Sequence, residues 1–166
     1  MITKLEGTYK SLSNYFEAPI EFKGITYRSN VVAFYAQFFD SEVQKRTFRN
    51  LLPNQAKILY NKFHRKELSI EEQLQIMHDI CVTKFNTYPE IKDILMKSEG
   101  KIYNNTTWEN TFWGITNSMG ENHTGKILEQ IREEFKEEVK KEEKKSKKKK
   151  ETEEKNENKQ EGFETN

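Results

Sequence analysis

One segment limits the possible folds of this chain more than any other. Residues 31–39 read VVAFYAQFF, so apolar side chains point in nearly every direction around a helix. A helix that is hydrophobic all round is buried, whereas a surface helix keeps a polar face. Ser29 stands just before the segment, where its hydroxyl is suited to cap the first turn. We therefore predict a buried central helix over Val31–Phe39, and this helix sets the fold.

The remaining elements are predicted from local patterns. Ile20–Phe22 and Ile25–Tyr27 are separated only by Lys23-Gly24, which is typical of a β-hairpin with a two-residue turn. Ser69 and Glu72 have the spacing of a capping box at the start of a helix. Further helices are predicted over 41–49, 53–62, 70–85, 88–96 and from 124 onward, with one more strand at 101–103. The fold class is mainly α with a small β element (α+β).

The carboxyl-terminal end differs in composition from the rest. Residues 133–166 contain 11 lysines and 12 glutamates but few large apolar side chains. We expect a folded domain over 1–133 and a charged extension over 134–166. The helix should reach about Lys145, and Ser146–Asn166 should be disordered, because too little apolar surface is present to offset the ordering entropy.

Charge and composition narrow the classes of partner. Residues 1–132 are nearly neutral, which gives no electrostatic case for sequence-specific nucleic-acid binding. The charged tail leaves a protein partner possible. The chain starts without an apolar run of signal-peptide length and has no membrane-spanning stretch, so we expect a cytoplasmic protein with no membrane partner.

Metal ions and cofactors are not expected. The three histidines have no cysteine or second histidine at metal-ligand spacing, and no glycine-rich phosphate loop is present. If a phosphate group is bound, the start of the helix at Thr124, with Lys126 nearby, is its expected position. Cys81 lies on the inner face of a helical pattern and is expected to be a buried, inert thiol.

The loop that precedes the last helix is rich in tryptophan, glycine and asparagine. Residues 108–132 read WENTFWGITNSMGENHTGKILEQIR. Glycines mark places where the backbone turns sharply or comes close to another group, and asparagine side chains both donate and accept hydrogen bonds. Such a loop either closes a turn around a buried indole or holds a polar ligand that carries a ring. Composition alone leaves both interpretations open.

The order of the residues is more specific than their composition. An upstream block and a downstream block resemble the opening and the carboxyl-terminal signature of the NADAR family (YbiA-like N-glycosidases). The matching residues are Leu12–Tyr15, Ala18–Ile20, Gly24–Tyr27, Ser29, Ala33, Phe34, Ala36, Phe112–Ile115, Gly120–Asn122 and Gly125–Leu128, with Arg132 after them. The resemblance covers residues 5–133 and implies the family's fold.

The resemblance also implies a chemistry. Members of the family cleave N-glycosidic bonds, some in riboflavin-pathway intermediates and others in ADP-ribosylated nucleobases. This hydrolysis has an oxocarbenium-like transition state and needs a positioned carboxylate. The family's acidic positions fall here on Val31, Asn105 and Asn110, its lysine on Phe38, and its tryptophan at or near Ser69. None of these side chains can replace the acid, the base or the cation.

Three functions remain open. The first is a protein that binds an ADP-ribose- or nucleotide-derived ligand with weak or no hydrolysis. The second is an active N-glycosidase with a displaced acid, for which Glu109 is the main candidate and Glu121 the other. The third is a scaffold or partner-binding protein whose pocket has collapsed. The predicted ligand-binding residues are Ser13, Asn14, Phe34, Asn110, Trp113, Glu121 and Asn122.

Overall fold

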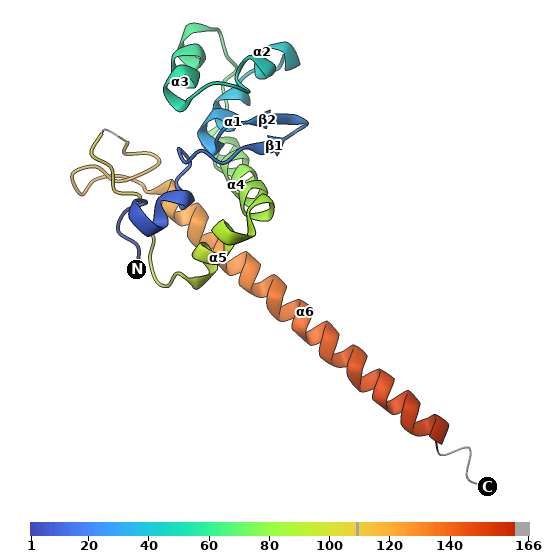
Figure 1. Cartoon of the computed structure of the whole chain (residues 1–166). Helices are drawn as coiled ribbons and strands as arrows, with labels where there is room; N and C mark the ends of the chain where they lie inside the picture. Colours follow the sequence, from blue (N-terminus) through green and yellow to red (C-terminus); the bar gives the residue numbers. More distant parts are fainter. Residues whose placement is uncertain (109, 162–166) are drawn as a thin grey trace. The chain divides into compact units, whose positions relative to one another are not determined.

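A computed structural model describes residues 1–108 and 110–161 of the chain, with side chains as far as Lys149. The chain divides into two compact units, Met1–Ile131 and Arg132–Asn166. The first unit is mainly helical and contains one two-stranded antiparallel sheet. This arrangement confirms the α+β fold class predicted from the sequence (Figure 1).

Helix α1, Asn30–Ala36, is the centre of the first unit. It contacts α2, α3, α4 and strand β2, and almost all of its side chains are buried (Figure 1). The helix ends earlier than predicted because the N–H groups of Gln37, Phe38 and Phe39 bond carbonyls three residues back, which tightens the last turn. Phe38 and Phe39 nevertheless stay in the core, with exposed fractions of 5% and 2%.

The predicted cap of α1 has a different chemistry. Ser29 stands at the capping position, but its buried hydroxyl has no hydrogen-bond partner. The N–H of Val31 in the first turn is bonded instead by the carbonyl oxygen of Asn14, at 3.0 Å. The Asn14 carbonyl therefore accepts the hydrogen bond that was expected for the Ser29 hydroxyl, and this bond joins Asn14 to α1.

The hairpin is confirmed. Strands β1, Ile20–Phe22, and β2, Ile25–Tyr27, pair in antiparallel register with Phe22 opposite Ile25. The turn residues Lys23 and Gly24 both have left-handed backbones, with φ of 50° and 78°. Two such residues match the right-handed twist of the strands. The remaining strand prediction was wrong, because residues 101–103 contribute only an isolated bridge, Ile102 with Ile2.

The other helices of the first unit follow the predicted order. They are α2 (Glu42–Thr47), α3 (Pro53–Lys62), α4 (Ile70–Thr87) and α5 (Pro89–Lys97), preceded by a 3-10 helix η1 (Gly7–Leu12) that sequence patterns did not indicate. The capping box of α4 is confirmed: Ser69 Oγ accepts from Glu72 N at 3.2 Å, and the Glu72 carboxylate accepts from Ser69 N at 2.8 Å. The buried side of α4 carries Met77, Ile80, Cys81, Lys84 and Phe85.

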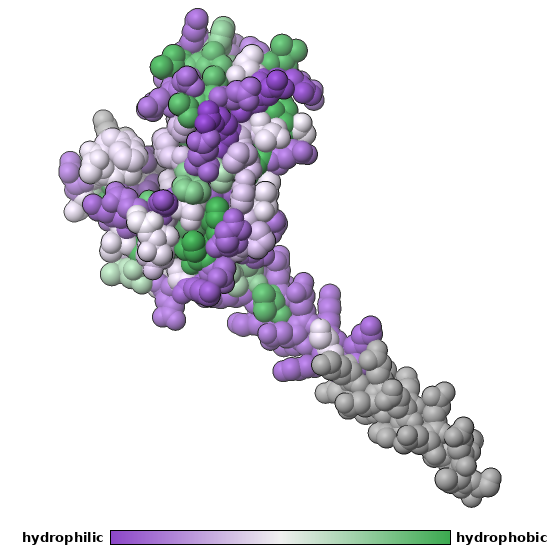
Figure 2. Space-filling model, viewed as in Figure 1, coloured by the Kyte–Doolittle hydropathy of each residue, from purple (hydrophilic) through white to green (hydrophobic). Residues whose placement is uncertain are grey.

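Helix α6 runs from His123 to Glu161. The prediction of disorder from Ser146 was wrong for the residues up to Glu161, which are helical. The sequence explains the continuation, since no Gly or Pro lies between Lys126 and Glu161 and Lys and Glu recur at i, i+4 spacing. Residues 162–166 lie outside the described residues. Figure 2 shows the described side chains of this helix beyond the first unit as mostly hydrophilic.

No helix among the described residues is both long and apolar enough to span a membrane.

Candidate functional site

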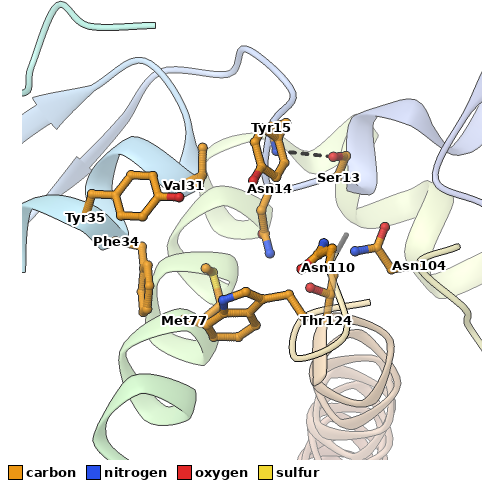
Figure 3. A pocket seen from close by; sticks show the side chains of 11 residues that line it. Ser13, Asn14, Tyr15, Val31, Phe34, Tyr35, Met77, Asn104, Asn110 and Thr124 are labelled. Carbon is orange, nitrogen blue, oxygen red and sulfur yellow. Dashed lines mark hydrogen bonds between the residues drawn. The ribbon is translucent and has the colours of Figure 1, made fainter. Parts of the chain in front are cut away.

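The first unit contains a pocket where five segments of the chain meet. The segment after η1, helix α1, helix α4, the loop leading into α6 and the first turn of α6 all contribute to it (Figure 3). It encloses about 40 Å³. Its lining residues are Ser13, Asn14, Tyr15, Val31, Phe34, Tyr35, Met77, Asn104, Asn110, Trp113 and Thr124. Five of the seven predicted ligand-binding residues are therefore together in one cavity.

Aromatic rings form one wall. The rings of Phe34 and Trp113 meet edge to face with centroids 5.2 Å apart. Trp113 also meets Phe112 in a T-shaped contact at 4.9 Å. Edge-to-face packing is favourable for aromatic pairs, so these contacts stabilise the wall. The two predicted stacking residues thus make a single continuous surface rather than a slot between two rings.

Asn14 supplies a fixed polar group at the floor of the pocket. The side chain is buried, and its Oδ1 accepts from Asn30 Nδ2 at 3.0 Å and from Cys81 Sγ at 3.3 Å. Because both neighbours donate to the oxygen, the amide orientation is set, and Figure 3 shows the nitrogen directed into the pocket. Asn14 therefore presents an N–H donor to any ligand that enters. The thiol of Cys81 has its pKa raised to about 11 by burial, as expected for an inert cysteine.

Lys84 lies directly behind this floor and was not singled out from the sequence. Its side chain is only 1% exposed, and Nζ donates to the carbonyl oxygen of Ser13 at 2.9 Å. Nζ also lies 5.6 Å from the ring centroid of Phe16. Burial lowers the pKa of Lys84 to about 8, opposed by the nearby Cys81. The lysine anchors the segment that carries Ser13 and Asn14 to α4.

Two tyrosines lie at the edge of the pocket. Tyr15 comes from the segment after η1 and Tyr35 from α1, and both side chains line the pocket. Burial is the largest influence on both groups and raises the pKa of each hydroxyl. Tyr15 also meets Trp108 edge to face, with centroids 6.1 Å apart. Neither tyrosine was among the ligand-binding residues predicted from the sequence.

The loop between Asn104 and His123 is shaped by close backbone contacts. A Cβ atom on Gly114 would lie 2.4 Å from the carbonyl oxygen of Asn104, and one on Gly125 would lie 2.0 Å from that of Ile102. Only glycine fits at such distances. Gly114 in the loop and Gly125 in the first turn of α6 are therefore explained by packing against the backbone of Asn104 and Ile102, which is the structural interpretation of the glycine-rich pattern. The same packing places Asn104, Asn110 and Trp113 at the pocket.

Two predicted ligand-binding residues are not part of the pocket lining. Glu121 is exposed and pairs with His123 at 2.8 Å. Asn122 is buried with φ of 54°, and its side chain bonds the backbone of Ile102 and Asn104 at 2.8 and 3.0 Å. Its amide therefore holds the loop together at the start of α6. Asparagine suits this position because it tolerates a left-handed backbone and both donates and accepts hydrogen bonds.

The residues that replace the acidic, lysine and tryptophan positions of the family pattern do not all lie at the pocket. Val31 and Asn110 line the pocket, whereas the Asn105 side chain donates to Thr3 O at 2.7 Å. Phe38 lines a neighbouring hollow, and Ser69 caps α4. Glu109, the candidate catalytic acid, lies outside the described residues. Among the residues that the structure describes, no carboxylate lines the pocket, and no group of three or more metal-ligating side chains gathers anywhere.

Comparison with known proteins gives the family. The model of the NADAR domain matches residues 3–136. This chain belongs to the NADAR domain family. A similar protein, "N-glycosidase Npun_R5314" from Nostoc punctiforme, is 35% identical over 59 residues, which are 35% of this chain and 38% of that relative. The matched part therefore spans less than half of the relative's length.

A solved structure supports the same fold. The NMR structure of the E. coli protein YbiA superposes with a TM-score of 0.72 at 24% identity, covering 84% of this chain and 87% of that one. The identity is low, so this likeness concerns the fold. Together with the family match, it confirms the NADAR-like, YbiA-like character predicted from the two sequence blocks.

Proposed function

We propose that this NADAR-domain protein binds an ADP-ribose- or nucleotide-derived ligand in the Phe34–Trp113 pocket, with weak or no hydrolysis of an N-glycosidic bond. One observation carries the proposal. The described lining of the pocket combines aromatic rings with amides and hydroxyls but contains no carboxylate. Rings and ribose hydroxyls are the groups that such a lining recognises.

The missing acid limits the chemistry. Cleavage of an N-glycosidic bond builds positive charge on the sugar, and a carboxylate is the group that stabilises this charge or activates water. At Val31 the side chain is a hydrocarbon, and at Asn110 it is a neutral amide. Loss of a positioned acid or base costs on the order of 10²- to 10⁴-fold in rate. The pocket is therefore better suited to binding a ligand than to hydrolysing its N-glycosidic bond.

The small size of the pocket has a consequence for entry. A cavity of about 40 Å³ holds roughly three waters at about 10–15 Å³ of probe volume each. A ribosyl or purine ring needs more room, so side chains at the edge move when it enters. Tyr15 is 43% exposed, and its contacts at the edge are with Tyr35 and Trp108. We therefore expect Tyr15 to move when a ligand enters, because it is the exposed side chain of the lining.

Calorimetric titration of the full chain with ADP-ribose, combined with chromatography of the mixture, tests the proposal. Saturable heat with intact ligand supports a binding protein. If an N-glycosidic conjugate of ADP-ribose is titrated instead, saturable heat together with released base or free ADP-ribose identifies an enzyme. Absence of heat with ADP-ribose, AMP and riboflavin phosphates overturns the proposal and favours a scaffold.

Hydrolysis by a displaced acid is the second candidate function. Glu109 is flanked in sequence by Trp108, which contacts the pocket residue Tyr15, and by Asn110, which lines the pocket. This position favours Glu109 over Glu121, which is exposed and paired with His123. If hydrolysis is found, Glu109→Gln should abolish it with binding retained, and unchanged turnover in that variant excludes Glu109.

A further inference from the structure

A second, larger hollow lies beside the pocket. It has a volume of about 470 Å³ and is formed by the loop between α3 and α4, by residues of α3 and α4, and by Phe38, which follows α1. Its lining residues are Phe38, Tyr60, Phe63, His64, Arg65, Lys66, Glu67, Leu68 and Gln73. Most of the accessible lining is polar, unlike that of the small pocket.

A single layer of rings separates the two cavities. Tyr35 lines the small pocket, and its ring lies 4.8 Å from the ring of Tyr60, which lines the hollow. Phe34 and Phe38 repeat this relation, with centroids 5.3 Å apart. The small pocket alone cannot contain a ligand as long as ADP-ribose. Because the rings close the direct path, such a ligand reaches both cavities only over the outer edges of Tyr35 and Tyr60, which are partly exposed.

Arg65 is fixed within the hollow. Its guanidinium carbon lies 4.1 Å from the ring centroid of Tyr60, and Nη1 donates to Tyr60 O at 3.3 Å. Stacking and the backbone hydrogen bond orient the planar guanidinium group before a ligand binds. The remaining N–H donors of its five are left for a ligand. Among the described residues, no carboxylate forms an ion pair with Arg65. Lys66 differs, because its Nζ pairs with Asp40 at 2.9 Å.

The other expected phosphate position is already occupied by protein groups. At the start of α6, the N–H of His123 bonds Phe112 O at 3.2 Å, and that of Thr124 bonds Trp113 O at 3.0 Å. Lys126 is exposed and lines a different hollow on the surface of α4 and α6. The amino end of α6 thus has fewer donors to offer an anion than the sequence suggested.

We propose that Arg65 binds the phosphate groups of the ligand in this hollow, while the sugar or ring end of the same molecule enters the Phe34–Trp113 pocket. This inference rests on the proposed function and adds its phosphate subsite. Arginine suits the role because its planar fork matches phosphate oxygens in a bidentate manner. His64 stands beside it on the same loop and lines the same hollow.

Titration of three full-length proteins tests the subsite. ADP-ribose and adenosine are titrated into the natural protein, into Arg65→Ala, and into Arg46→Ala as a control that removes an exposed, salt-bridged arginine of α2. Arg65→Ala should weaken ADP-ribose binding roughly 10- to 100-fold, the range for a lost hydrogen bond to a charged group, and change adenosine binding less than threefold. Arg46→Ala should leave both affinities unchanged.

Two further measurements keep the outcome clear. Inorganic pyrophosphate should compete with ADP-ribose for the natural protein but not for Arg65→Ala. Arg65→Lys, which keeps the charge but not the fork, should recover only part of the affinity, and this variant covers the case in which Arg65→Ala unfolds. Equal ADP-ribose affinity in the natural protein and both Arg65 variants overturns the subsite while the proposed function stands. Failure of the natural protein to bind either compound overturns both.

Discussion

Asn110 places an amide at the pocket in a position where the family resemblance implies an acid. The backbone around it is well fixed, because its carbonyl accepts from Gly114 N at 2.9 Å and its N–H donates to Thr116 Oγ1 at 3.2 Å. A substitution at this residue therefore changes the chemistry of the pocket with little effect on the path of the loop.

We expect Asn110→Asp to increase hydrolysis of an N-ribosyl substrate at least about tenfold over the natural protein, because it restores a carboxylate at the pocket. This is less than the roughly 10²- to 10⁴-fold given by an optimised acid or base. Release of the base, followed by chromatography, measures the rate. Asn105→Asp is the matched control, since that side chain bonds Thr3 O. An equal increase in both variants contradicts a role for the position.

Lys84 makes stability depend on pH. Its pKa in the folded protein, about 8, lies below the ordinary value of 10.5. Between these values the unfolded chain binds more protons than the folded one, so the free energy of unfolding rises with pH across this window. Below pH 8 Lys84 stays protonated in the folded protein, and burial of its charge lowers the free energy of unfolding by the full amount. Cys81 and the buried tyrosines act in the opposite direction, because their folded pKa values are raised.

Comparison with Lys84→Met isolates the lysine from these other groups. Relative to the variant, the natural protein should gain up to about 3 kcal/mol of unfolding free energy between pH 8 and 10.5, at 1.36 kcal/mol per pKa unit. Urea denaturation at several pH values measures this difference. Parallel pH profiles for the two proteins contradict the assignment.

At the scale of elements, two serines at helix starts have opposite roles. Ser69 exchanges hydrogen bonds with Glu72 at the start of α4, whereas the Ser29 hydroxyl is buried without a partner at the start of α1. Ser69→Ala should lower the free energy of unfolding by about 1 kcal/mol, the usual value of a cap. Ser29→Ala should be neutral or stabilising, because it removes a buried hydroxyl that bonds nothing. Chemical denaturation checks both, and a larger loss at Ser29 than at Ser69 contradicts the described caps.

The same two serines show what the sequence predicts well and what it does not. Local signals gave the hairpin turn at Lys23-Gly24, the start of α3 at Pro53 and the capping box of α4, because each depends on residues a few positions apart. Ser29 carries an equally good local signal. The Asn14 carbonyl takes its place through a contact that no local pattern contains.

The candidate site follows the same rule. Residues inside the family blocks, such as Asn14, Phe34 and Trp113, line one pocket, and their role in ligand binding stays a prediction. Lys84 was missed because its neighbour Ser13 is 71 positions away. Asn122 was assigned to the ligand, yet its amide bonds the loop backbone, a use that only the left-handed geometry shows.

At the scale of the whole molecule, the folded unit and the charged extension are distinct. The first compact unit ends at Ile131, and the family match ends at residue 136. The predicted boundary at 133/134 lies between these two positions. Beyond it the sequence is dominated by Lys and Glu, whose i, i+4 pairs add only about 0.2–0.5 kcal/mol each to a helix.

A chain that ends at Lys136 should keep the cooperative unfolding of the natural protein, with a Tm within about 2 °C. The side chains of residues 137–149 are exposed, and exposed residues contribute little to stability. Far-ultraviolet circular dichroism should lose helical signal, while near-ultraviolet signals from the aromatic rings stay unchanged. A fall in Tm of more than about 5 °C contradicts an independent first unit.

The two tryptophans make the intrinsic fluorescence of this protein a probe of its pocket. Trp108 is 54% exposed at the rim, while Trp113 is partly buried and packs against Phe34 and Phe112. Trp113 lines the pocket, and Trp108 contacts the pocket residue Tyr15. Emission from the unlabelled chain should therefore change in wavelength or intensity when the cavity fills, so that entry can be followed in real time by stopped-flow fluorescence without adding any dye.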